Sequence, residues 1–162
     1  MLTPLAWLLG LLLPACAASG ARGVPATVPD FTHLVRPTTP NTALAAPAGY
    51  SPRPDIVTPI YAVSPTHLFA AVQQIAAKQS ATYKLAEDLE TMREGWVARS
   101  LVLNFPDIIW AEVRPAEGTS SELLLYSRSV YGYGDFGVNR RRIAAWVVAV
   151  TDALNDQDVK RP

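Results

Sequence analysis

Residues 127–146, SRSVYGYGDFGVNRRRIAAW, connect a strand-like pattern to a helix-like pattern and decide how the C-terminal half of the chain folds. Before them, residues 122–130 read as a strand. After them, apolar side chains recur at helical spacing over residues 136–154. Asp135 stands where its carboxylate can accept backbone N–H groups of the first helical turn. The stretch therefore predicts a tight strand-to-helix connection, in which glycines allow the chain to turn and Asp135 caps the helix.

The three consecutive arginines of this stretch fall on different sides of the predicted helix. With successive side chains about 100° apart, Asn139 faces the apolar side and Arg140 lies at its edge. Arg142 lies on the opposite flank, and Arg141 points to solvent. We therefore expect Asn139 and Arg140 to face the fold.

Two roles are open for these inward-facing polar residues. In the first, they clamp strand to helix, because a buried polar group without a hydrogen bond costs about 1–3 kcal/mol; Asn139 then bonds to the connecting loop and Arg140 pairs with Asp135 or Asp107. In the second, the start of the helix and Arg140 form a pocket for a small anion or a lipid head group. The candidate binding residues are Asn139, Arg140, Asp135, Arg128, Arg99 and Tyr133.

The remaining patterns predict the fold class. Residues 55–63 read as a strand that Pro59 restricts to a sheet edge or a bulge, and Ser64 and Pro65 start a helix over residues 65–79. Four strands joined by short turns follow at residues 81–90, 96–105, 108–114 and 122–130. We predict an α+β fold: an antiparallel meander sheet of four to five strands, with two helices packed on one face. Trp110 and Tyr126 would then line the uncovered face.

The N-terminal part of the chain predicts export. Residues 5–13, LAWLLGLLL, are too few to span a bilayer and suit a secretory signal. Cys16 ends the lipobox-like stretch LPAC and is the candidate lipidation site, while ordinary cleavage after Ala17 is the alternative. Either processing leaves the mature protein without a thiol. We assign residues 1–16 to a signal peptide, 17–54 to a proline-rich tether and 55–156 to a single domain.

Composition narrows the possible functions. The chain has 14 basic and 14 acidic residues, which argues against nucleic acid as a partner. The two histidines, His33 and His67, are far apart in the sequence, and no cluster has the spacing of metal ligands. We therefore predict no catalytic residue, no metal and no cofactor.

Several stretches together resemble a known family. FPDIIWAEV at 105–113 follows an Arg99-Ser100 strand end, and the motif residues are Gly132, Asp135, Gly137, Asn139, Arg140 and Arg142. These features resemble the domain of unknown function 1499 family of bacterial and plastid proteins, over residues 37–154. The resemblance implies a domain type but no activity, because none is established for the family.

The sequence thus favours an exported, lipid-anchored envelope domain, on the periplasmic side of a bacterial membrane, with a non-catalytic binding or structural role. One alternative is a binder of a small anion or lipid head group at residues 132–142. Another is an enzyme that acts on a charged substrate. The expected partners are the membrane, through the lipid anchor, and an anionic small molecule or an envelope protein.

Overall fold

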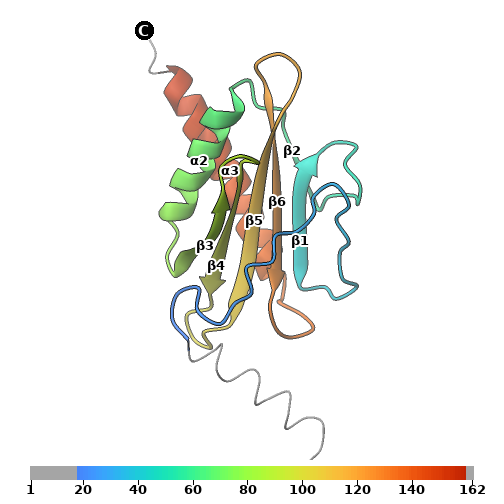
Figure 1. The fold of residues 1–162 in the computed structure, drawn as a ribbon, viewed down its shortest axis with the longest axis vertical. Coiled ribbons are helices and arrows are strands. Elements are labelled where there is room, and N and C mark those ends of the chain that lie inside the picture. The colour runs from blue at the N-terminus through green and yellow to red at the C-terminus, as the bar shows by residue number, and fades with distance from the viewer. Residues whose placement is uncertain (1–17, 160–162) are drawn as a thin grey trace, which may run out of the picture.

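The computed structural model describes residues 18–159, which build a six-stranded sheet and two helices (Figure 1). The predicted signal peptide and Cys16 lie outside these residues. In chain order the elements are β1 (Thr42–Pro47), β2 (Ile56–Thr58), α2 (Pro65–Ala77), β3 (Thr82–Asp88), β4 (Arg93–Arg99), β5 (Pro106–Pro115), β6 (Ser121–Ser129) and α3 (Val138–Val159).

The sheet is mixed, with the strand order β2-β1-β6-β5-β4-β3. Strands β3 to β6 form the predicted antiparallel meander. The prediction of a purely antiparallel sheet of four to five strands is wrong, because β1 adds to β6 and β2 pairs with β1 in parallel. Asp55 ties the returning chain to β1: its backbone N–H donates to the Leu44 carbonyl, and its carboxylate accepts the Leu44 N–H, both at 2.8 Å.

Both helices pack on one face of the sheet, as predicted (Figure 1). Helix α2 starts at the expected cap, where the Ser64 hydroxyl accepts the His67 N–H and Pro65 takes the first helical position. The core on this face joins α2 and α3 to alternate residues of the strands, with Leu68, Ile109, Leu125, Ile143 and Trp146 among its members. Neither helix within residues 18–159 is long and apolar enough to cross a membrane.

The other face of the sheet is covered by the N-terminal segment rather than left open. Phe31 and Leu34 pack there against Leu44, Trp110 and Tyr126, and all five are buried. Figure 1 shows this segment, drawn in blue, crossing the sheet on the side away from the helices. The expectation that Trp110 and Tyr126 line an uncovered face is therefore wrong.

The predicted tether over residues 17–54 is also corrected. Its residues 42–47 form the buried strand β1, and its earlier part supplies the cover just described. The strand escapes prediction because TALAAP has no aromatic residue and is buried on both faces, so it shows no alternation of apolar and polar residues.

Candidate functional site

The start of α3 is closed by Asp135. One carboxylate oxygen accepts the Gly137 backbone N–H at 2.8 Å, and the other accepts the Asn139 backbone N–H at 2.7 Å. The chain can turn here because Gly137 adopts a positive φ of 73°. The predicted capping role of Asp135 is confirmed, and its carboxylate occupies the N–H groups that an anion would otherwise use.

Asn139 is fully buried at the centre of a polar network. Its amide NH₂ donates to the Asn41 carbonyl and to the Ser129 hydroxyl, both at 3.1 Å. Its side-chain oxygen accepts from Arg142 at 2.7 Å and from the Ser127 hydroxyl. All four hydrogen-bonding positions of the amide are thus used, and they join α3 to the end of β6 and to the residue that precedes β1.

Arg142 extends this network to β5. Its Nη2 donates to the Asp107 carboxylate at 2.8 Å, while its Nη1 bonds to Asn139. We predicted that Arg140 would be the inward-facing arginine, and this is wrong, because the side chain of Arg140 is exposed. The two arginines lie on opposite flanks of the same apolar face. Only the Arg142 flank lies beside Asp107 and Ser127, so the neighbouring strands decide which arginine is held.

Asn41 is a network residue that the sequence did not indicate. Its amide donates to the Gly132 carbonyl at 2.7 Å and accepts from the Thr39 hydroxyl at 2.7 Å. Its backbone carbonyl accepts from Asn139 and from the Ser129 N–H. No local pattern marks it, since it lies in the stretch that reads as a tether.

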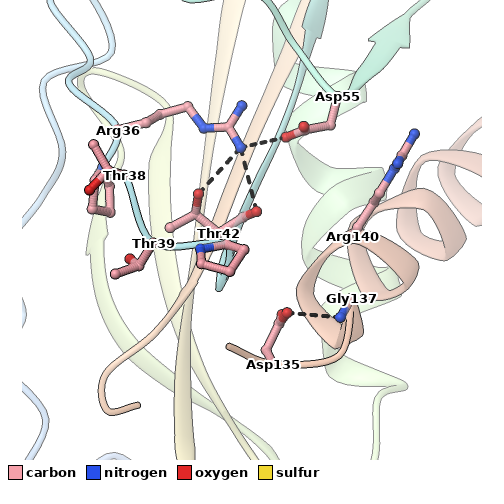
Figure 2. A pocket seen from close by; sticks show the side chains of 10 residues that line it. Arg36, Thr38, Thr39, Thr42, Asp55, Asp135, Gly137 and Arg140 are labelled. Atoms are coloured by element: carbon pink, nitrogen blue, oxygen red, sulfur yellow. Dashed lines mark hydrogen bonds and ion pairs between the residues drawn. The ribbon is translucent and has the colours of Figure 1, made fainter. Parts of the chain in front are cut away.

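Arg140 lines a separate hollow of about 370 Å³ beside the start of α3. Figure 2 shows Arg36 on the far side, directed at Asp55 and Thr42, with Arg140 extending from the first turns of the helix. Arg36 pairs with Asp55 at 2.7 Å. Within residues 18–159, the side chain of Arg140 makes no hydrogen bond or ion pair. The hollow therefore holds one arginine that is free to meet a ligand.

The structure does not bring the other candidates to this place. Arg128 follows Tyr126 on the opposite face of the sheet, in a hollow lined by the N-terminal segment. Arg99 is buried and donates to the carbonyls of Gly20 and Arg22. Tyr133 is largely exposed on the connecting loop. Of the six predicted residues, only Asp135 and Asn139 belong to the network.

The chemistry of the described residues is that of a clamp. Asp107, Arg142, Asn139 and their serine partners satisfy one another and hold β1, β5, β6 and α3 in register. Across residues 18–159, no group of three or more His, Cys, Asp or Glu side chains is placed to hold a metal ion.

The comparisons with known proteins agree with this extent of the fold. A family model described as "Protein of unknown function (DUF1499)" matches residues 34–150, from before β1 into α3. No curated protein matches the chain.

Proposed function

The chain belongs to the DUF1499 family of proteins of unknown function, and we propose that this member is an exported, lipid-anchored module with a non-catalytic binding or structural role at a membrane surface. The proposed location is the periplasmic side of a bacterial membrane, and the proposed anchor is an acylated Cys16.

The observation that carries this proposal is the way the chain enters the fold. The Asn104 side-chain amide donates to the Ala18 carbonyl at 3.0 Å, and Arg99 donates to the Gly20 carbonyl at 2.7 Å and the Arg22 carbonyl at 2.9 Å. Ala18 follows Cys16 by two residues, which corresponds to at most about 7 Å of extended chain. An acylated Cys16 would therefore hold the folded domain directly against the membrane, with almost no free tether.

The polar network supports a non-catalytic role for the junction at 132–142. A catalytic or ligand-binding amide needs a free hydrogen-bonding position, whereas each position on Asn139 is taken by the protein itself. Each oxygen of the Asp135 carboxylate likewise accepts one backbone N–H from the start of α3, which gives this side chain a structural role.

Metabolic labelling with a radioactive fatty acid tests the anchor. We expect the wild-type protein to incorporate label and to sediment with membranes, and we expect Cys16→Ala to lose both properties. Ala17→Ser serves as a control, because it changes the neighbouring residue and leaves the thiol in place. Equal labelling of wild type and Cys16→Ala, or no labelling of either, would contradict the proposal.

A second candidate function rests on Arg140. Its guanidinium has no partner in residues 18–159 and borders a hollow that also holds Arg36 and the hydroxyls of Thr38, Thr39 and Thr42. Such a set can bind a small anion or a phosphate head group. Asp55 and Asp135 also line the hollow and weaken the attraction.

Titration with inorganic phosphate, followed by calorimetry, tests whether the hollow binds an anion. Binding should be lost in Arg140→Ala and retained in Arg141→Ala, whose arginine is exposed but does not line the hollow. Absent binding, or equal binding by both variants, argues against this site.

A further inference from the structure

One end of the molecule carries a group of exposed apolar side chains. Leu101, Val102 and Leu103 are 87%, 91% and 62% exposed, and they follow one another in the turn between β4 and β5. Phe136, which is 97% exposed, lies in the loop that leads into α3. With Phe105 they border an apolar hollow of about 500 Å³. We call these five residues the apolar end.

The turn that carries these side chains is held by its own hydrogen bonds. The Ser100 N–H donates to the Phe105 carbonyl at 2.9 Å, the Asn104 N–H donates to the Ser100 carbonyl at 3.0 Å, and the Ser100 hydroxyl accepts the Phe105 N–H at 2.9 Å. The backbone is thus fixed by its own hydrogen bonds while the side chains of Leu101 and Val102 stay almost fully exposed. Three successive exposed apolar residues gain nothing from the fold itself, which is typical of a surface that contacts a partner.

The position of the apolar end indicates which partner it contacts. Asn104, inside the same turn, bonds to Ala18, so the chain enters the fold at this end. Figure 1 shows the start of the described chain and both apolar loops together at the lower end of the molecule. The 17 residues that precede Ala18 include the apolar stretch 5–13 and Cys16. An attachment through Cys16 would therefore hold the domain at this end.

The charges around the apolar end suit an anionic lipid surface. Arg141 is exposed beside it, and its guanidinium Nη1 donates to the carbonyl of Phe136 at 2.8 Å. The acidic residues that line the hollow are Asp107 and Asp135, and both are bonded within the fold. An apolar tip with a cation beside it is typical of surfaces that enter the head-group region of a bilayer.

We propose that the apolar end is a membrane-docking surface, in which the side chains of residues 101–105 and Phe136 enter the outer part of a lipid bilayer. This inference rests on the membrane attachment proposed above and adds which face of the domain meets the lipid. The guanidinium of Arg141 then lies at the level of the phosphate groups.

A fluorescent probe on single cysteines tests the docking. Both predicted routes of processing leave the mature protein without another thiol, so Val102→Cys and Thr119→Cys can each carry one environment-sensitive dye. Thr119 is exposed in the hairpin between β5 and β6, at the opposite end of the molecule (Figure 1). In vesicles of phosphatidylethanolamine and phosphatidylglycerol with spin-labelled acyl chains, we expect the dye at 102 to shift to the blue and be quenched. The dye at 119 should do neither.

Two further variants connect this result to the apolar side chains. The change Leu101→Ser together with Leu103→Ser should weaken the membrane-inserted state of the dye at 102 by about tenfold or more, since full burial of a single leucine side chain already contributes about tenfold. Val35→Ser is the matched control, because Val35 is as exposed as Leu101 but belongs to the N-terminal segment. It should leave the quenching unchanged.

Three outcomes would overturn the docking surface. They are equal quenching of the two dyes, no quenching of either, or a blue-shifted dye at 102 before lipid is added, which would mean that protein covers the apolar end. Fatty-acid labelling reports separately on the anchor. Labelling without quenching leaves the anchor and removes the docking surface, whereas quenching without labelling does the reverse.

Discussion

Gly95 on β4 and Trp110 on β5 are cross-strand partners, and the indole ring covers the glycine. A Cβ atom at position 95 would lie 2.8 Å from three carbons of the six-membered ring. Glycine is therefore required for the close approach of the ring and not for an unusual backbone conformation. Trp110 in turn supports Phe31 and Leu34, so this residue pair controls how the N-terminal segment lies on the sheet.

Gly95→Ala is expected to lower the free energy of unfolding by about 1–3 kcal/mol, because the tightly packed indole must move. Urea unfolding, followed by tryptophan fluorescence, measures the change. Gly134→Ala is the matched control: nothing lies within 4 Å of a Cβ at that position, and its φ is not positive, so its stability should be near wild type. Similar losses for the two variants would contradict this account of Gly95.

At the same scale, the sequence predicted the residues whose roles depend on near neighbours. Asp135 as a cap and Asn139 as an inward-facing residue follow from spacing along the helix, and both are correct. Spacing along the helix placed Arg140 rather than Arg142 toward the fold, and this is wrong, because both border the apolar face. The distinction comes from Asp107, which is more than thirty residues away in the chain.

Among the elements, the junction of β6 and α3 is the one most dependent on polar bonds. Asn139→Ala removes the partner of the Ser127 and Ser129 hydroxyls, of Arg142 and of the Asn41 carbonyl, in a place that water does not reach. We expect a loss of about 3 kcal/mol in the free energy of unfolding, measured by urea titration. Arg140→Ala, one residue further on, should change it by less than about 0.5 kcal/mol because the side chain is exposed. Equal effects of the two substitutions would mean that the network does not stabilise the junction.

The sequence pattern did not predict the ends of the elements correctly. The strand predicted over residues 96–105 ends at Arg99, because the apolar run Leu101, Val102 and Leu103 forms a turn and not a continuation of the strand. Apolar residues in a row normally indicate burial, and here they are exposed at the surface that we propose for membrane docking. The three residues that were wrongly assigned to a strand are therefore the same three that we propose for membrane docking.

For the molecule as a whole, the sequence predicted the class of fold and the placement of both helices, but not the full sheet. Strands β3 to β6 could be predicted because successive strands with short turns pair as neighbours. β1 could not, because its partners are distant in the chain and its composition of alanine and proline suggests a linker. The family match from residue 34 onward includes β1 as well.

The contact between Ala18 and Asn104 also limits the order in which parts of the domain can fold. The two residues are 86 positions apart. Residues 18–22 therefore have no place to dock until β4 and the turn after it have been synthesised. If the chain is exported from its N-terminal end, residues 18–22 reach the far side before the turn that fixes them. The side of the domain that we propose faces the membrane therefore cannot be completed before residue 104 has crossed.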